Sequence, residues 1–526
     1  MTDALLPRLA LLAAAAVWQA ARSRHYFHML QLNSYRNERY AAWLSKNAPR
    51  LWFFAGLPAA VATAVALTMG LPGMLAAAFG YALAAVYTLC AKKPEKKPFV
   101  VTDRVKRQFL AAAGLLLAAL LLTALVWHAA PYWGAGLLLL FVTLPVPVGL
   151  PPAANRLMAG RERRIADSFV RSAQQKLQSQ RDFIVIGVTG SYGKTSVKYI
   201  LSELLREKYN TLMTPESYNT TMGVVRTVNE QLRPQHQVFV CEMGARQVGD
   251  IKEICDIVHP TYGIITSVGI AHLETFRTTE NIRKTKFELA DSLPENGLAF
   301  LNFDSTPVAS AGYTRPHVSY GLTPGLDCYS DDISVSEQGT SFTLHCKGHE
   351  PLRLTTRLLG RHNVLNITGA AALALHLGVS PAGITAALRR LKPVPHRLEL
   401  KNNGGVIVID DAYNSNPEGA AEALRVLGSL QGRRRILITP GMVELGENEY
   451  AANRELGRVA APHCDDVIAV GRVRDALFEG LDSEGFPEQR RHAVKNLREA
   501  LALLPQLLTG PSAVLLENDL TDDMES

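Results

Sequence analysis

One stretch constrains the fold of this chain more than any other, because it joins a strand pattern, a glycine loop and a helix pattern without a break. Phe183–Thr189 is a run of apolar and β-branched residues. Gly190–Ser196 reads Gly-Ser-Tyr-Gly-Lys-Thr-Ser, and Val197–Leu205 carries apolar residues at helical spacing. That order directs backbone N–H groups and a helix N-terminus at one point, which is where polyphosphates bind.

Two side chains of this loop have the chemistry that a nucleotide needs. Lys194 is expected to reach the outer phosphates, and the Thr195 hydroxyl is expected to ligate Mg²⁺. Val188 stands where the generic phosphate-loop pattern has a glycine, so an ordinary glycine turn with a surface lysine is the alternative interpretation. The residues expected to bind ATP are Gly190, Ser191, Gly193, Lys194, Thr195 and Ser196.

The charge of the chain is unevenly distributed. Residues 1–165 carry 18 Lys/Arg against 5 Asp/Glu, and the remainder carries 37 against 43. The net charge of +7 therefore comes from the apolar N-terminal part, and nucleic-acid binding loses its main support.

The cysteines show no CxxC spacing, so free thiols in a reducing compartment are expected rather than a disulfide framework or a zinc site. The six are Cys90, Cys241, Cys255, Cys328, Cys346 and Cys464.

Five apolar segments precede the loop, and each is close to the ~20 residues that cross a bilayer core. They are Leu5–Ala21, Leu51–Met69, Leu71–Cys90, Phe109–Ala129 and Trp133–Leu150. A soluble helical bundle is the alternative, but it needs polar faces that these segments lack. A cleaved signal peptide is the alternative for the first segment, but Asp3 precedes it and Arg22 follows it, the reverse of the usual charge order. We expect an all-α transmembrane region over residues 1–150, with the lipid bilayer as its partner.

The loops between these segments predict their orientation. Positively charged loops stay in the cytoplasm, and Arg22–Arg50, Ala91–Gln108 and Asn155–Ile165 hold six, seven and four Lys/Arg. The turns near Gly70 and at Ala130–Tyr132 hold none. Five crossings therefore start outside and end inside. The prediction is a multi-pass protein of the plasma (inner) membrane with its catalytic domains in the cytoplasm.

After the glycine loop the chain alternates strand-like and helix-like runs, which is typical of a parallel sheet covered by helices. Gln237–Cys241 reads as a buried strand, and Glu242 stands at its carboxyl end, the edge at which ligands bind in open α/β sheets. Glu242 is therefore placed to meet a Mg²⁺ held by Thr195. His272 follows a third strand and Lys286 lies in a charged helix; taken alone, each reads as an ordinary core or surface residue.

These residues belong to a longer series of motifs. In chain order it comprises Thr189–Thr195, Cys241–Gly244, Ile270–Glu274, Lys286–Glu288, Gly360–Ile367, Pro395–Glu399, Asp410–Pro417 and, more loosely, Gly441–Gly446. The series resembles the Mur ligases, which are ATP-dependent peptide ligases of bacterial wall precursors. The form Asp-Asp-Ala-Tyr-Asn-Ser-Asn-Pro at Asp410–Pro417 is most similar to the MurF branch, which adds D-alanyl-D-alanine to the muramoyl tripeptide. The resemblance covers residues 183–526.

The resemblance implies a role for single residues. Glu242 and His272 would be magnesium ligands with Thr195, and Lys286 matches a lysine that family members carry as a carbamate, an anion able to ligate a second metal. Arg397 matches the arginine that reaches the γ-phosphate. Catalysis would rest on Lys194, Glu242, His272, Lys286 and Arg397. Further nucleotide contacts would come from Asn363, Asn366 and Asp411. Substrate contacts would come from Asn219, Tyr413, Asn414 and Asn416.

The implied reaction is the formation of an amide driven by ATP. A substrate carboxylate attacks the γ-phosphate to give an acyl phosphate, and an incoming amine then displaces phosphate. Two Mg²⁺ ions, Lys194 and Arg397 would neutralise the charge that develops. The expected α/β architecture has a P-loop central domain at 183–395, with a strand-rich excursion near Leu326–Leu354. A Rossmann-like domain at 396–526 brings the amine, and a linker helix at 151–182 joins both to the membrane region.

Two departures from the family leave the substrates open. The domain that holds the UDP-sugar in soluble members is replaced by the membrane region, so the carboxylate of a peptide or sugar-peptide is either UDP-linked or lipid-linked. The closing basic motif is replaced by Leu516–Leu520, Leu-Glu-Asn-Asp-Leu, so the amine, an amino acid or a dipeptide, is open too. A membrane-bound poly-γ-glutamate-type synthase would keep the chemistry with another product. An ATP-driven transporter and a nucleotide-binding scaffold without chemistry are alternatives of different classes.

Overall fold

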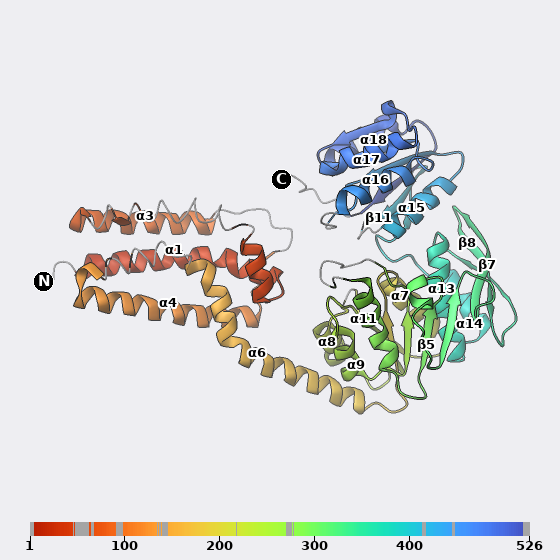
Figure 1. The fold of residues 1–526 in the computed structure, drawn as a ribbon, viewed down its shortest axis with the longest axis horizontal. Coiled ribbons are helices and arrows are strands. Elements are labelled where there is room, and N and C mark those ends of the chain that lie inside the picture. The colour runs from red at the N-terminus through yellow and green to blue at the C-terminus, as the bar shows by residue number, and fades with distance from the viewer. Residues whose placement is uncertain are drawn as a thin grey trace. The chain divides into compact units, whose positions relative to one another are not determined.

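The computed structural model forms two compact units, Met1–Ser168 and Phe169–Ser526 (Figure 1). It describes residues 5–45, 47, 61, 63–64, 68–90, 98–133, 135, 138, 146–216, 218–269, 276, 278–412, 417–443 and 448–518. The first unit is all-helical, and the second holds two β-sheets with their covering helices. This is the expected mixed α/β architecture with an all-α N-terminal region.

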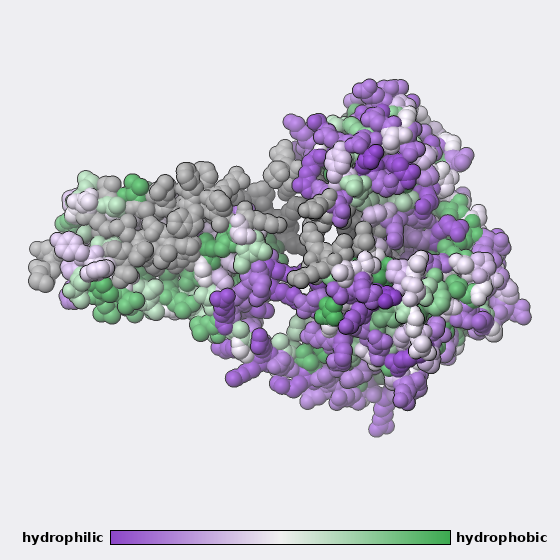
Figure 2. All heavy atoms as spheres, viewed as in Figure 1, coloured by the Kyte–Doolittle hydropathy of each residue, from purple (hydrophilic) through white to green (hydrophobic). Residues whose placement is uncertain are grey.

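The first unit packs three long helices side by side (Figure 1). They are α1 (Leu5–Leu32), α3 (Gly70–Cys90) and α4 (Asp103–Ala129). Leu11, Ala15 and Trp18 pack with Tyr81 and Trp127 in the core between them. The helices α3 and α4 also expose large apolar side chains on their outer faces, and Figure 2 shows hydrophobic residues along the visible face of α4. Apolar faces on both sides of a helix are what a lipid environment accepts and water does not.

Among the described residues, α3 and α4 are the two helices long and apolar enough to cross a membrane. Of the other three predicted segments, Leu5–Ala21 lies within α1. Leu51–Met69 and much of Trp133–Leu150 lie outside the described residues. Two apolar helices support a membrane region only in part, and five crossings with an outside N-terminus stay a prediction.

A buried asparagine joins the polar ends of the helices in the first unit. Asn155 lies on α6 (Val146–Gln178), the long helix that continues into the second unit. Its amide donates to the Tyr35 carbonyl and to Asn37 Oδ1, each at 2.9 Å, and its Oδ1 accepts from Gln108 Nε2 at 2.8 Å. Because a buried amide is stable only when it is hydrogen-bonded, this network fixes the first part of α6 against α4 and the segment that follows α1.

The central domain is built on a nine-stranded sheet with the order β2-β3-β1-β4-β5-β6-β7-β8-β9. Pairings from β2 to β7 are parallel, and β7, β8 and β9 are antiparallel. The parallel strands are β1 (Ile184–Thr189), β2 (Thr211–Met213), β3 (Val238–Glu242), β4 (Tyr262–Ile265), β5 (Leu298–Asn302) and β6 (His317–Gly321). The strand-rich excursion predicted near Leu326–Leu354 is confirmed as β7 (Cys328–Ser336), β8 (Gly339–Cys346) and β9 (Leu352–Thr356).

Helices cover both faces of this sheet and form a hydrophobic core with each. One face carries α7 (Lys194–Leu205), α13 (Arg361–His376) and α14 (Pro381–Arg390). The other carries α8 (Thr221–Gln231), α9 (Asp250–Val258) and α11 (Thr279–Asp291); the short α12 (Thr306–Ala309) follows β5. Parallel strands buried on both faces explain why β1 and β3 read as continuous apolar runs in the sequence.

The C-terminal domain is a second, smaller α/β sheet with the order β10-β11-β15-β12-β13-β14. Apolar runs at Val406–Asp410, Arg435–Thr439, Val467–Val470 and Ala513–Leu516 predict four strands. The structure confirms them as β11 (Val406–Asp411), β12 (Arg434–Thr439), β13 (Asp466–Val470) and β15 (Ser512–Glu517). The sequence reading did not include β10 (Glu399–Asn403) and β14 (Arg491–Val494), which close the two edges. The covering helices are α15 (Pro417–Ser429), α16 (Glu449–Ala460), α17 (Arg474–Ser483) and α18 (Leu497–Leu507).

The cysteine prediction is wrong for one pair. Cys328 and Cys346 lie directly opposite each other on β7 and β8, with their Cα atoms 4.1 Å apart, and form a disulfide. They are 18 residues apart in sequence, and only the register of the β7–β8 hairpin brings them together, which spacing alone does not show. Cys90, Cys241 and Cys255 are free, as is Cys464. Cysteine usage therefore no longer supports a reducing compartment.

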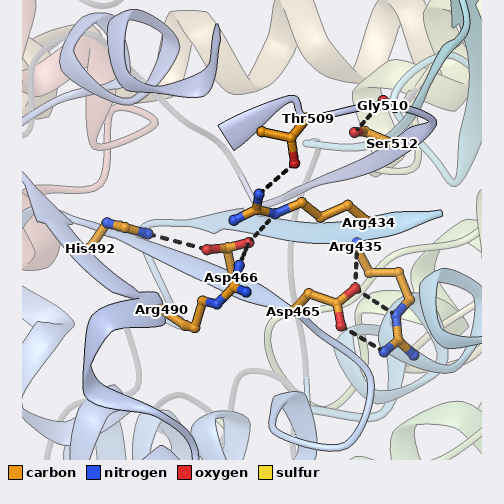
Figure 3. A network of polar contacts seen from close by, with 9 residues as sticks. All are labelled: Arg434, Arg435, Asp465, Asp466, Arg490, His492, Thr509, Gly510 and Ser512. Atoms are coloured by element: carbon orange, nitrogen blue, oxygen red, sulfur yellow. Dashed lines mark hydrogen bonds and ion pairs between the residues drawn. The ribbon is translucent and has the colours of Figure 1, made fainter. Parts of the chain in front are cut away.

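A network of ion pairs lies at the amino ends of β12 and β13 (Figure 3). The Asp466 side chain is 1% exposed and accepts a hydrogen bond from Arg434 Nε at 2.7 Å. Arg490 and His492 also approach this carboxylate, at 3.5 and 3.4 Å. The network lies at the end of the sheet opposite the carboxyl ends of the strands, so we assign it to stability.

Asp466→Asn is expected to lower the free energy of unfolding of the C-terminal domain by about 3 kcal/mol, because it leaves the largely buried Arg434 without its counter-ion. Chemical denaturation of the purified protein measures this change. Asp475→Asn is the matched control, because Asp475 pairs with Arg474 at an exposed position, where an ion pair contributes about 0–1 kcal/mol. Equal losses of stability in the two variants would contradict the assignment.

Candidate functional site

The loop between β1 and α7 takes its shape from two glycines. Gly190 has φ 151° and Gly193 has φ 79°, both in the region that favours glycine. A Cβ atom on Gly190 would lie 2.0 Å from Thr266 Oγ1, and one on Gly193 would lie 2.7 Å from Asn366 Oδ1. Because α7 begins at Lys194, its first turn leaves backbone N–H groups without partners inside the helix. The loop is therefore shaped to receive an anion.

The Lys194 side chain lies over this loop. Its Nζ donates hydrogen bonds to the carbonyl oxygens of Gly190, at 2.7 Å, and Ser191, at 3.0 Å. The pKa of Lys194 is lowered to about 8, chiefly by burial; the negative charge of Glu242 opposes this shift, and the positive charge of Arg397 contributes to it. Without a ligand the ammonium is thus held by backbone carbonyls, which bound phosphate oxygens would replace.

Gly193→Ala is expected to weaken ATP binding about tenfold or more, because a left-handed alanine costs about 1–2 kcal/mol and its Cβ would displace Asn366. A fluorescent ATP analogue titrated into the purified protein measures the dissociation constant. Gly348→Ala is the matched control, because Gly348 has φ 82° with no atom within 4 Å of an added Cβ and lies in the β8–β9 turn. If both variants bind the analogue alike, Gly193 does not shape a nucleotide site.

Glu242 is the second centre of the site. It ends β3, is 1% exposed, and lies beside the glycine loop, since β1 and β3 are neighbours in the sheet. Its Oε1 accepts hydrogen bonds from Thr195 Oγ1, at 3.2 Å, and from Asn219 Nδ2, at 2.9 Å. The structure therefore brings together Thr195, Asn219 and Glu242, three residues singled out from the sequence.

Lys198 also belongs to this centre, and sequence reasoning missed it. Its Nζ lies 3.0 Å from Glu242 Oε2, and its side chain is 2% exposed. The signal was present, because Lys198 stands four residues after Lys194 and therefore on the same face of α7. A lysine within a helix pattern is ordinarily interpreted as solvent-exposed, so the sequence analysis did not select Lys198.

Lys286 lies on α11 and is 4% exposed. Its pKa is lowered to about 7, chiefly by burial and also by the positive charge of Lys194, while the negative charges of Glu288 and Asp250 oppose the shift. A substantial fraction of this amine is therefore neutral near neutral pH. A neutral buried amine is the form that reacts with an electrophile such as CO₂.

Two asparagines of α13 approach the loop differently. The Asn366 side chain lies against Gly193, as the short distance to its Oδ1 shows. Asn363 is buried, and its amide donates to the Leu359 carbonyl at 2.8 Å, within the start of its own helix. Ser191 Oγ donates to the Gly269 carbonyl at 3.3 Å, and Ser196 lies in the first turn of α7.

Arg397 and Asp411 come from the start of the C-terminal domain. His396 and Leu398, on either side of Arg397, both have positive φ values, 58° and 46°, and backbone held in this way clusters at functional sites. Asp411 Oδ1 accepts the Leu398 N–H at 3.1 Å. Burial raises the pKa of Asp411, while that N–H and the charges of His362 and Arg397 oppose the shift. Arg397 thus acts electrostatically on both Lys194 and Asp411.

Some predicted residues lie outside the described part of the chain: His272, Tyr413, Asn414 and Asn416. Among the described residues, no three His, Cys, Asp or Glu side chains gather as a preformed metal cluster. The donors still fit Mg²⁺, because Thr195 and Glu242 supply the oxygen ligands that this ion prefers. Glu242 Oε2 is buried and has no hydrogen-bond partner in the described structure apart from its ion pair with Lys198.

Comparison with known proteins covers most of the second unit. Residues 188–374 match the family model "Mur ligase middle domain", and residues 396–517 match "Mur ligase, glutamate ligase domain". UDP-N-acetylmuramoyl-tripeptide--D-alanyl-D-alanine ligase of Escherichia coli is 32% identical over 352 residues, which are 65% of this chain and 75% of the relative. The Bacillus subtilis ligase of the same name is 33% identical over 56% of this chain and 64% of its own length.

Solved structures agree with these matches. MurF from Acinetobacter baumannii superposes with a TM-score of 0.60 and 29% identity over 66% of this chain and 76% of its own. MurF from Thermotoga maritima in complex with ADP gives a TM-score of 0.59 and 27% identity over 67% and 79%. Fold, site and relatives define the class as an ATP-dependent ligase that forms amide bonds. The chain belongs to the Mur ligase family.

Proposed function

We propose that this protein is a membrane-tethered, MurF-like ligase that joins an amine to a peptide carboxylate in bacterial peptidoglycan synthesis. The observation that carries the proposal is one cluster at the carboxyl ends of β1 and β3. Lys194 and Thr195 on the loop meet Glu242 there, with Lys286 close enough to Lys194 to be shifted by its charge. A lysine ammonium group and a carboxylate at one site suit ATP bound with a divalent metal.

The names of the relatives suggest the substrates. These relatives are ligases of UDP-N-acetylmuramoyl-tripeptide and D-alanyl-D-alanine. We propose the same chemical classes here: the terminal carboxylate of a sugar-linked peptide, and a dipeptide or amino acid as the amine. The family models begin at residue 188 and so leave the first unit of this chain uncovered. A lipid-linked form of the carboxylate substrate would suit a ligase held at the bilayer.

Different residues of this chain have different roles in the proposed reaction. Lys194 leaves its two loop carbonyls and binds the outer phosphates of ATP, while Arg397 brings a second positive charge from the C-terminal domain. Thr195 and Glu242 would hold Mg²⁺, which would supply charge neutralisation at the phosphates. The substrate carboxylate attacks the γ-phosphate, and the amine then displaces phosphate from the acyl phosphate. Positioning and electrostatic stabilisation suffice for this step, without a nucleophilic side chain.

Lys286 is proposed to act as a carbamate. Its neutral amine attacks CO₂, a proton leaves, and the product is a buried carbamate anion next to Lys194. That anion would ligate a second Mg²⁺, with His272 as a further proposed ligand. The lowered pKa of Lys286 supports this assignment, since only the neutral amine reacts.

Residues 1–150, which lie within the first unit, are proposed to be the membrane region. A linker helix at 151–182 and the two ligase domains at 183–395 and 396–526 follow. The apolar outer faces of α3 and α4 support it. In the proposed orientation the ligase domains are cytoplasmic. Tethering would keep the enzyme near a substrate carried at the bilayer.

The proposal is tested with the full chain purified in a lipid nanodisc. ADP release is followed with ATP, Mg²⁺, UDP-N-acetylmuramoyl-tripeptide or its lipid-linked form, and D-alanyl-D-alanine or single amino acids. We expect ADP release to require both a carboxylate and an amine, and mass spectrometry to show one new amide per ADP. ATP turnover that never depends on an amine would refute the ligase function and favour a transporter.

A further inference from the structure

Lys198 is a buried lysine at the centre of the site, without a part in the chemistry described so far. It stands one helical turn beyond Lys194 on α7 and lies 3.0 Å from Glu242 Oε2. Its Nζ also donates to the Glu216 carbonyl, in the loop between β2 and α8. That loop carries Asn219, which binds the other oxygen of Glu242. Lys198 therefore connects α7, the end of β3 and this loop.

The two carboxylate oxygens of Glu242 have different surroundings. Oε1 faces Thr195, whose hydroxyl is the expected metal ligand of the loop, and it accepts two hydrogen bonds. Oε2 faces Lys198. Within the described structure its ion pair with Lys198 is the contact that holds it, and it accepts no further hydrogen bond. One oxygen is thus turned to the nucleotide side and the other is held by a buried ammonium group.

This difference matters for the choice of metal. Mg²⁺ requires nearly ideal octahedral geometry and takes a carboxylate through one oxygen, whereas Ca²⁺ accepts six to eight ligands and often binds both oxygens of a carboxylate. A carboxylate with one oxygen held by an ammonium group binds a cation through the other oxygen alone. Binding through both oxygens would first have to break the ion pair in a site that excludes water.

We infer that Lys198 is a positioning residue, which restricts Glu242 to binding a divalent cation through Oε1 alone and thereby makes the site select Mg²⁺ over Ca²⁺. The inference rests on the proposed function, because it takes Glu242 as a metal ligand. A lysine that served only to neutralise Glu242 would stabilise the fold without affecting the choice of metal.

The test measures binding rather than turnover. A non-hydrolysable ATP analogue is titrated into the full chain with saturating Mg²⁺, with saturating Ca²⁺ and with EDTA, and calorimetry gives three dissociation constants. Lys198→Gln removes the charge and keeps a hydrogen-bond donor. We expect it to reduce the ratio of Mg²⁺-supported to Ca²⁺-supported affinity about tenfold or more. Lys252→Gln, which removes an exposed lysine of α9, should leave the ratio unchanged.

The possible results separate this inference from the proposed function. If the wild-type protein binds the analogue equally well with and without a divalent metal, the proposed metal site fails. If the wild-type protein needs the metal and Lys198→Gln weakens Mg²⁺- and Ca²⁺-supported binding by the same factor, Lys198 is structural and the inference is overturned. Because both metals are compared in one sample, partial loss of folded protein does not change the ratio.

The wild-type protein gives a second test, which holds even if Lys198→Gln does not fold. Infrared difference spectra with the Mg²⁺–analogue complex, compared with those of Glu242→Gln, isolate the carboxylate stretching bands of Glu242. Binding through one oxygen widens the separation of the symmetric and antisymmetric bands, which is the expected result. A narrowed separation would mean that both oxygens bind Mg²⁺, and would overturn the inference.

Discussion

Replacing Lys194 with methionine is expected to lower kcat/KM for ATP-dependent amide formation by about a thousandfold, within the range found when one preorganised electrostatic contact to the transition state is removed. The reason is that Lys194 is the half-buried lysine of the phosphate loop, with its Nζ on the Gly190 and Ser191 carbonyls. Methionine keeps the length and apolar character of the side chain but supplies no charge.

The control for this change is Lys252→Met. Lys252 forms an exposed pair with Asp256 on α9, and its loss should leave kcat/KM within twofold of the wild-type value. ADP release under single-turnover conditions measures the chemical step directly. An activity of Lys194→Met within tenfold of the wild type would mean that the loop lysine does not stabilise the transferred phosphate.

Lys286→Ala is expected to reduce turnover a hundredfold or more, because it removes the proposed carbamate and with it the ligand of a second metal. Short carboxylic acids such as acetate or propionate should restore part of the activity, since they can place a carboxylate in the cavity that the shorter side chain leaves. Steady-state ADP release with and without added acid measures the rescue. A variant that is inactive with every acid tested leaves the carbamate without support, and a variant with full activity refutes it.

The pKa of Lys286 adds a pH dependence to this result. Its pKa in the folded protein is lowered to about 7 from the ordinary lysine value of 10.5. The unfolded chain therefore binds the proton more tightly, and folding stability falls as the pH falls from about 10.5 to about 7 and then stays constant. The neutral amine, and therefore the capacity to bind CO₂, increases as the pH rises through about 7. Wild-type activity should accordingly depend more strongly on added bicarbonate at pH 6.5 than at pH 8, whereas Lys286→Ala should be insensitive to bicarbonate at both.

The parts of the site that the sequence predicted are those specified by local pattern. The loop at Gly190–Ser196 follows a strand and opens a helix, so its pattern can be recognised from neighbouring residues. Glu242 was found because it ends an apolar run, and the carboxyl ends of parallel strands meet at one edge. The central and C-terminal strands were recognisable for the same reason, as short apolar runs separated by helical ones.

The parts that sequence reasoning missed depend on contacts between distant segments. Lys198 reads as a surface lysine until β3 places Glu242 beside it. Cys328 and Cys346 read as unrelated thiols until the β7–β8 register sets them opposite each other. The edge strand β10 carries mostly polar residues, Glu-Leu-Lys-Asn-Asn, and is a strand because β11 offers it hydrogen bonds. Pairing of this kind is a property of the fold rather than of a sequence window.

The central claim is that ATP activates a substrate carboxylate for attack by an amine, and oxygen-isotope transfer tests it most directly. The carboxylate substrate is prepared with ¹⁸O in its terminal carboxyl group and incubated with the full chain, ATP, Mg²⁺ and the amine that supports turnover. If an acyl phosphate forms, one ¹⁸O passes from the carboxylate to each phosphate released, and mass spectrometry will show singly labelled phosphate together with the amide. Unlabelled phosphate released alongside ADP would show that ATP is hydrolysed by water, and would contradict the ligase account.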